Sequence, residues 1–126
     1  MRICIDLDGV ICELRQPGQR YSDLKPVAGA AEKLQSLRRA GHEVIVHTAR
    51  HMRTCSGNVG LVLARQGMIS LRWLEGHCIE FDEIHFGKPH ADVYLDDNGM
   101  RFVGWQSIDG DGTNLPLSKE KVQADA

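Results

Sequence analysis

Residues 3–10 (Ile-Cys-Ile-Asp-Leu-Asp-Gly-Val) constrain the fold of this chain more than any other segment. An apolar run delivers two carboxylates, Asp6 and Asp8, and is followed by Gly9, which permits a sharp turn. Residues two apart in a strand point the same way, so both carboxylates should face one spot beyond the strand, where open α/β sheets hold ligands. Their repulsion at ~4 Å is worth several kcal/mol at a low effective dielectric. The pair therefore predicts a site for a hard divalent metal ion.

Apolar periodicity along the chain predicts parallel strands joined by helices. We expect strands over 2–7, 43–48, 79–85 and 92–95, and a last edge element near 102–105. Helices are expected over 27–40, ending at Gly41, over 58–66, closed by Gly67, and over 70–76. This alternation is typical of an α/β protein with a three-layer, doubly wound (Rossmannoid) parallel sheet.

The length of the chain sets its domain organisation. A chain of 126 residues has room for one core, which we place at residues 1–105, and none for a separate cap domain. The polar segment 13–26 can serve as a flap over the site. Residues 106–126 are expected to form a polar C-terminal tail, part of which could be disordered.

Charge and composition exclude several classes of partner. A net charge of −2 argues against nucleic acid, which usually requires a basic stripe. The sequence shows neither a signal peptide nor an apolar span of ~20 residues, so we expect a cytoplasmic protein without a membrane partner. The four cysteines, at positions 4, 12, 55 and 78, lack the paired spacing of a zinc site and are expected to be reduced.

Polar or charged side chains that can take part in catalysis lie at or after the end of each predicted strand. Thr48 ends the second strand, Lys88 follows the third, and Asp96 with Asp97 follows the fourth. Together with the first segment, these motifs resemble those of the haloacid dehalogenase (HAD) phosphohydrolase superfamily. The matching segments, in order, are Asp6-Leu-Asp8-Gly9-Val10, His47-Thr48-Ala49-Arg50, Gly87-Lys88-Pro89 and Tyr94-Leu95-Asp96-Asp97-Asn98.

The resemblance implies a role for each matched residue, and the chemistry of the side chains agrees with it. Asp6 would be the nucleophile that forms an aspartyl phosphate, and Asp8 the general acid and base. Thr48 and Lys88 would stabilise charge on the phosphoryl oxygens. Mg²⁺ would be held by Asp6, Asp8 and one of the two later aspartates, of which Asp96 is preferred to Asp97.

Residues close to these motifs are candidates for binding the substrate. Backbone amides near Gly9 and Ala49 can donate to phosphoryl oxygens, and Arg50 and Arg53 could hold a distal anionic group. The stretches 49–54, 57–60, 81–89 and 94–97 look like those of small capless phosphatases linked to capsular polysaccharide biosynthesis. This likeness implies a phosphorylated sugar or similar metabolite as the substrate, without identifying it.

The absence of a cap domain leaves open how the site excludes water. We expect a neighbouring subunit to cover it, in a homo-oligomer that is a dimer or tetramer with apolar flap or tail residues at the contact. Two alternatives are a receiver-like signalling module and an inactive phosphate-binding module. A receiver needs a phospho-accepting aspartate on its third strand, and no aspartate lies between residues 24 and 81.

Overall fold

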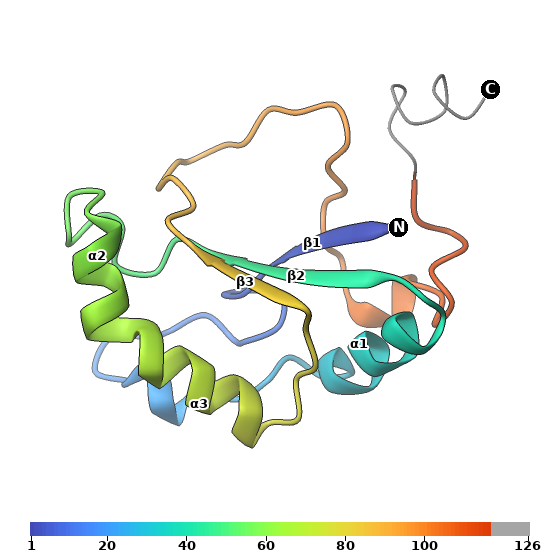
Figure 1. Ribbon diagram of the computed structural model, residues 1–126, viewed down its shortest axis with the longest axis horizontal. Helices are drawn as coiled ribbons and strands as arrows, with labels where there is room; N and C mark the ends of the chain where they lie inside the picture. The colour runs from blue at the N-terminus through green and yellow to red at the C-terminus, as the bar shows by residue number, and fades with distance from the viewer. Residues whose placement is uncertain (117–126) are drawn as a thin grey trace.

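The computed structural model describes residues 1–116 and shows an α/β protein built on a three-stranded parallel sheet (Figure 1). The strands are β1 (Arg2–Asp6), β2 (Glu43–Thr48) and β3 (Glu83–Phe86), in the spatial order β1-β2-β3. Asp6 is in register with His47, and Thr48 with Phe86, so the three strands end at one edge of the sheet. The expectation of a parallel α/β sheet is confirmed.

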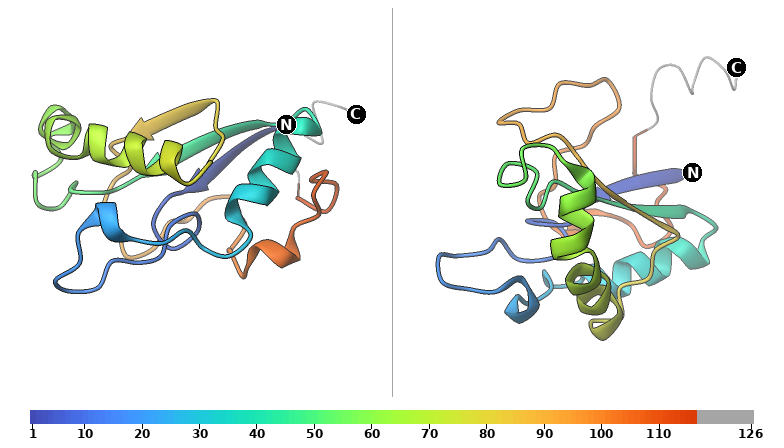
Figure 2. Two further views of the ribbon diagram at one scale, coloured as in Figure 1. Left: turned by 90° about the horizontal axis from the view of Figure 1, so that it is seen from below. Right: turned by 60° about the vertical axis from the view of Figure 1, so that its left-hand side comes forward.

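Both crossover connections place their helices on the same face of the sheet. Helix α1 (Ala30–Arg39) connects β1 to β2, and a second helical segment connects β2 to β3. Two successive right-handed crossovers that proceed in one direction must cover the same face. Figures 1 and 2 show α1 and α3 on that side. The described residues therefore form two layers, not the three predicted.

The core lies between this face and its helices. Val44, Val46 and Leu34 are fully buried, Ile5 of β1 is buried beside them, and Ile3 is partly buried against the same cluster. The opposite face of the sheet carries Arg2, which bonds to both Glu43 and Glu83 on the neighbouring strands. These polar side chains agree with the absence of a helical layer over this face among the described residues.

The predicted fourth strand is absent from the described residues, which corrects the expectation for 92–95. Residues 87–104 form an extended loop, in which Leu95 is 95% exposed and Val93 71%. Tyr94 instead makes local contacts, donating its hydroxyl to the Pro89 carbonyl and packing its ring on Lys88. The apolar residues of 92–95 therefore do not form a strand. They do not pair with β1, and they stay exposed.

The second helical segment is continuous, whereas two helices separated at Gly67 were expected. It comprises α2 (Val59–Val62), a π-helical turn η2 (Leu63–Gly67) and α3 (Met68–Gly76). Gly67 has φ of −56°, an ordinary helical value, and is buried within the segment. Gly67 therefore does not end the helix, and the chain passes through it in a π turn.

The remaining element boundaries differ modestly from expectation. Helix α1 begins at Ala30 rather than at residue 27, and β3 begins at Glu83 rather than at 79. A short 3₁₀ turn, η1 (Tyr21–Asp23), lies in the flap, and another, η3 (Trp105–Ser107), replaces the expected edge element.

Residues 106–116 pack against α1. Ser36 donates to the Gly110 carbonyl at 2.8 Å, and Lys33 donates to the Ile108 carbonyl. Trp105 is buried and donates its indole N–H to the Val10 carbonyl at 2.8 Å, which connects this segment to the loop after β1. The rest of the expected tail, residues 117–126, lies outside the described residues.

Candidate active site

The nucleophile candidate and the lysine candidate meet at the carboxyl edge of the sheet. Asp6 is the last residue of β1, and Lys88 follows β3, where its backbone N–H donates to the Thr48 carbonyl at 3.1 Å. The Lys88 ammonium lies 3.6 Å from Asp6 Oδ2, and the Leu7 amide donates to Asp6 Oδ1 at 3.0 Å. The order of the strands thus brings together two residues far apart in the chain.

Burial and charge act on Asp6 in opposite directions. Burial raises the pKa of the Asp6 carboxyl above its ordinary value, and Asp8 adds to this effect. Lys88 and the Leu7 amide oppose the rise without cancelling it. The pKa of His47, which is in register with Asp6, is lowered by burial and then by Lys88.

Asp8 lies in a tight loop directly after β1. The amides of Ile11 and Cys12 both donate to the Leu7 carbonyl, and the Gly9 amide donates to the Cys12 carbonyl at 2.7 Å. Gly9 has φ of +90°, a conformation that L side chains rarely adopt. The turn predicted at Gly9 is therefore confirmed.

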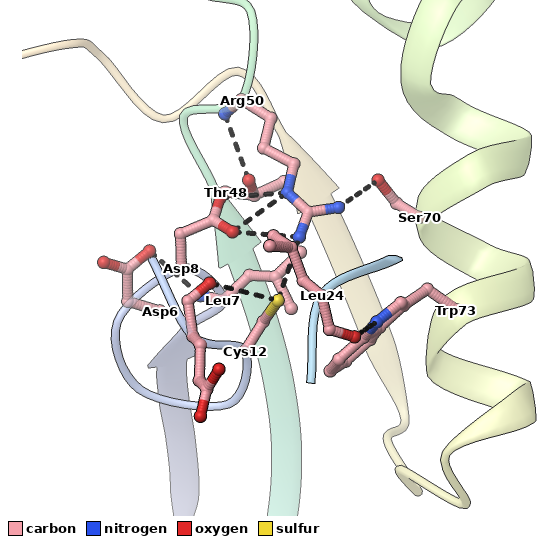
Figure 3. A network of polar contacts seen from close by, with 10 residues as sticks. Asp6, Leu7, Asp8, Cys12, Leu24, Thr48, Arg50, Ser70 and Trp73 are labelled. Carbon is pink, nitrogen blue, oxygen red and sulfur yellow. Dashed lines mark hydrogen bonds and ion pairs between the residues drawn. The ribbon is translucent and has the colours of Figure 1, made fainter. Parts of the chain in front are cut away.

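The two carboxylates have different partners. Figure 3 shows Asp8 directed toward Arg50, while Asp6 points to the other side. Arg50 Nε lies 2.9 Å from Asp8 Oδ2, and Arg50 Nη2 lies 2.9 Å from Asp8 Oδ1. The expectation that both carboxylates face one spot is therefore only partly met, because Asp8 is held by an arginine.

Thr48 and the residues that follow it form the next part of the site. The Thr48 side chain is buried, and its hydroxyl accepts from the Arg50 amide at 3.1 Å. Ala49 is partly buried between them, whereas Arg53 is exposed. His51, with φ of 58°, shows that this loop takes a conformation uncommon for residues other than glycine.

The later aspartates do not join this group. Asp96 and Asp97 lie in the exposed 87–104 loop, where Asp96 accepts from the Gly99 amide at 2.6 Å. Within residues 1–116, no cluster of three or more His, Cys, Asp or Glu side chains is arranged to hold a metal ion. The donor chemistry of Asp6 and Asp8 fits Mg²⁺, but the third ligand is not beside them, so magnesium binding stays a prediction.

Sequence reasoning missed several residues around Asp8. Ser70 on α3 accepts from Arg50, Tyr21 of the flap places its ring under the Arg50 guanidinium, and Cys12 lies 3.5 Å from Arg50 Nη2. Burial raises the pKa of the Cys12 thiol to about 11, despite the nearby arginine. Helical spacing could have indicated Ser70, a small polar residue on the buried face of α3, but not its partner.

Comparison with known proteins supports the fold. No protein-family model and no curated protein matches the sequence. An MCSG target from Vibrio cholerae is 28% identical in sequence, with a TM-score of 0.73 over 98% of this chain and 94% of that chain. A chain of the Pnkp1/Rnl/Hen1 complex is 23% identical, with a TM-score of 0.51 over 77% of this chain and 30% of that chain. These structures share the α/β architecture.

Among residues 1–116, no helix combines the length and the apolar character needed to cross a membrane.

Proposed function

We propose that the protein is a phosphomonoester hydrolase of the HAD type that works through an aspartyl phosphate on Asp6. The observation that carries this proposal is the ion pair between Asp6 and Lys88, formed at the edge where the three strands end. A half-buried carboxylate beside a lysine offers an anionic nucleophile together with a cation for the phosphoryl oxygens. The motif resemblance gives the same roles to the same residues.

The first step is attack by an Asp6 carboxylate oxygen on phosphorus. A bond forms between that oxygen and phosphorus, the bond from phosphorus to the leaving oxygen breaks, and Asp8 gives its proton to the leaving oxygen. Lys88 lies close enough to Asp6 to reduce repulsion between the carboxylate and the incoming phosphoryl group. The Thr48 hydroxyl can donate to the same oxygens, since it only accepts in the present network.

The second step returns the enzyme to its starting state. Asp8, now a carboxylate, accepts a proton from water as that water attacks phosphorus. The bond between Asp6 and phosphorus breaks, and inorganic phosphate and the free Asp6 carboxylate result. Asp8 follows Asp6 by two residues, in the tight loop after β1, which keeps the two residues at the same end of the strand.

For Mg²⁺, we propose that Asp6, the Asp8 backbone carbonyl and Asp96 or Asp97 hold the ion. Bound there, it would polarise a phosphoryl oxygen and neutralise negative charge. Because the 87–104 loop now holds Asp96 in a local turn, this part of the proposal requires that the loop rearrange.

We propose a small phosphorylated metabolite as the substrate, in particular a sugar phosphate for surface polysaccharide synthesis. The partly exposed Asp6 is open to a small phosphate ester, and a neighbouring subunit would cover it. The support is the segment likeness noted above, together with the small size of the flap, which is too short to form a cap domain.

The experiment that tests the proposed function measures phosphate release from p-nitrophenyl phosphate and from a panel of hexose, heptose and pentose phosphates, with and without Mg²⁺. We expect Mg²⁺-dependent release by the wild type and none by Asp6→Asn, while exposed Asp23→Asn behaves like the wild type. Release by Asp6→Asn at a near wild-type rate would refute the assignment of the nucleophile.

A second candidate is a module that binds phosphate without turnover. The observation in its favour is the double contact of Arg50 with Asp8, because a carboxylate held by an arginine can serve a purely structural role in a binding site. The same assay separates the two: saturable binding of a sugar phosphate without release of inorganic phosphate would support the binding module.

A further inference from the structure

Arg50 is the most completely buried cation near the proposed site. The residue is 3% exposed overall, and its side chain is 0% exposed. Burying a guanidinium destabilises the folded state unless its charge is paired and its N–H groups are hydrogen-bonded. The contacts of Arg50 therefore indicate its role.

Nearly every donor of this guanidinium is used. Nε donates to both Asp8 carboxylate oxygens, at 3.1 and 2.9 Å, and Nη2 donates to Asp8 Oδ1 at 2.9 Å (Figure 3). Nη1 donates to Ser70 Oγ at 3.1 Å, and Nη2 also lies 3.5 Å from Cys12 Sγ. The expected contact of Arg50 with substrate stays a prediction, but the arrangement directs Arg50 toward Asp8.

The support around Arg50 comes from three separate parts of the fold. Its backbone amide is fixed by Thr48 Oγ1, its guanidinium by Ser70 on α3, and its face by Tyr21, whose ring centroid is 4.3 Å away. Such contacts leave a planar guanidinium one orientation, which it imposes on a carboxylate through paired hydrogen bonds.

We propose that Arg50 is a positioning residue that fixes the orientation of Asp8 for proton transfer; this inference rests on the proposed phosphatase function. Oδ1 accepts from two Arg50 nitrogens and Oδ2 from one. We therefore assign the transferred proton to Oδ2, which keeps more free lone-pair capacity. In the first step Oδ2 gives that proton to the leaving oxygen, and in the second it takes one from water.

The role predicts a specific kinetic pattern. Proton donation matters for an alkoxide leaving group and hardly for p-nitrophenolate, so misplacing Asp8 should affect the two classes of substrate unequally. An arginine that bound the substrate would instead alter KM for both classes.

The experiment compares Arg50→Gln and Arg50→Lys with the wild type, using β-glycerol phosphate and p-nitrophenyl phosphate in steady-state assays. The matched control is Arg72→Gln, because Arg72 is an exposed arginine on α3. We expect kcat/KM for β-glycerol phosphate to fall about 10²-fold in both Arg50 variants and kcat/KM for p-nitrophenyl phosphate to fall less, because kcat/KM reports the first step, in which only the alkoxide needs the proton. Circular dichroism and thermal unfolding establish that each variant is folded, and Arg50→Lys retains the positive charge if Arg50→Gln does not fold.

A double-mutant cycle tests whether Arg50 acts through Asp8. In an Asp8→Asn background, we expect Arg50→Lys to cause no further loss of kcat on β-glycerol phosphate. An equal loss in both backgrounds, or a rise in KM with unchanged kcat, would overturn the positioning role while leaving the phosphatase function intact. A wild type that hydrolyses neither substrate, or an Asp6→Asn variant that hydrolyses both, would overturn the proposed function and this inference with it.

Discussion

Lys88 Nζ lies 3.6 Å from Asp6 Oδ2, and this ion pair joins the end of β1 to the segment that follows β3. β2 lies between these two strands, so the contact spans the whole edge of the sheet. The Tyr94 ring also contacts the ammonium group, with its centroid 4.2 Å from Lys88 Nζ. The proposed chemistry therefore depends on the alignment of the strand ends, which brings Asp6 and the loop residue Lys88 together.

The first prediction concerns the stability of Asp6→Asn as a function of pH. The pKa of Asp6 is raised in the folded protein, so the folded state holds its proton more tightly than the unfolded state does. As pH rises from the ordinary value of 3.8 through the raised value, the wild type loses this contribution to its free energy of unfolding. Asparagine cannot ionise, so the stability difference in favour of Asp6→Asn should grow with pH and then level off. Urea unfolding at a series of pH values measures it, and a difference that shrinks with rising pH would contradict the prediction.

A second prediction concerns Lys88→Met. Lys88 is the strongest opponent of the raised Asp6 pKa, so its removal should move the acid limb of the kcat/KM profile to higher pH. Loss of its charge should also lower kcat about 10²- to 10³-fold. Lys88→Arg should retain part of the rate, and exposed Lys25→Met should retain all of it. A Lys88→Met profile that coincides with the wild-type profile would show that the ion pair has no part in the reaction.

The sequence correctly predicted the carboxyl ends of β1 and β2, and the reason is physical. An apolar strand followed by polar residues specifies both its burial and the place where it ends, so Asp6 and Thr48 could be assigned from the sequence to the ends of β1 and β2. Parallel order then brings their carboxyl ends together without further information.

What could not be predicted depends on contacts between distant side chains. The pairing of Arg50 with Asp8 requires Ser70, Tyr21 and the loop after β1 to converge, and no spacing in the sequence encodes that convergence. The segment 92–95 was predicted as a strand from its composition, but it lies in a loop. There Tyr94 contacts Pro89 and Lys88 instead of pairing in the sheet. Gly67 likewise reads as a helix end, but tertiary packing carries the helix through it.

The third prediction separates the two proposed roles of Asp8. Asp8→Asn keeps the size of the side chain but cannot exchange a proton, so hydrolysis of β-glycerol phosphate should fall about 10²- to 10⁴-fold. Formation of the aspartyl phosphate from p-nitrophenyl phosphate should suffer less, and a burst of p-nitrophenolate in rapid mixing should therefore precede slow turnover. Equal losses on both substrates, with no burst, would argue against the acid role.

The fourth prediction concerns the flap and the oligomer. Leu14, in the flap, is 63% exposed, an apolar residue well placed for contact with a second copy. We expect light scattering at micromolar concentration to give the mass of a dimer or tetramer, and Leu14→Asp to lower that mass together with the activity. Gln16→Asp, at an exposed polar position of the same segment, is the control. A wild-type monomer with full activity would remove the need for a covering subunit.

The fifth prediction concerns the 87–104 loop and Mg²⁺. Within the described residues β1 is one of the two edge strands of the sheet, and Val93, Tyr94 and Leu95 are exposed, with Tyr94 against Lys88. If Asp96 or Asp97 binds an ion held by Asp6, the preceding residues must move closer to β1, and their amides should exchange more slowly with deuterium. Mg²⁺ should therefore protect 92–95 in the wild type and fail to do so in Asp6→Asn. Asp96→Asn and Asp97→Asn, measured beside Asp92→Asn, then identify the ligand as the variant with the weaker Mg²⁺ affinity. Mg²⁺-dependent turnover without any change in exchange over 92–99 would place the third ligand elsewhere.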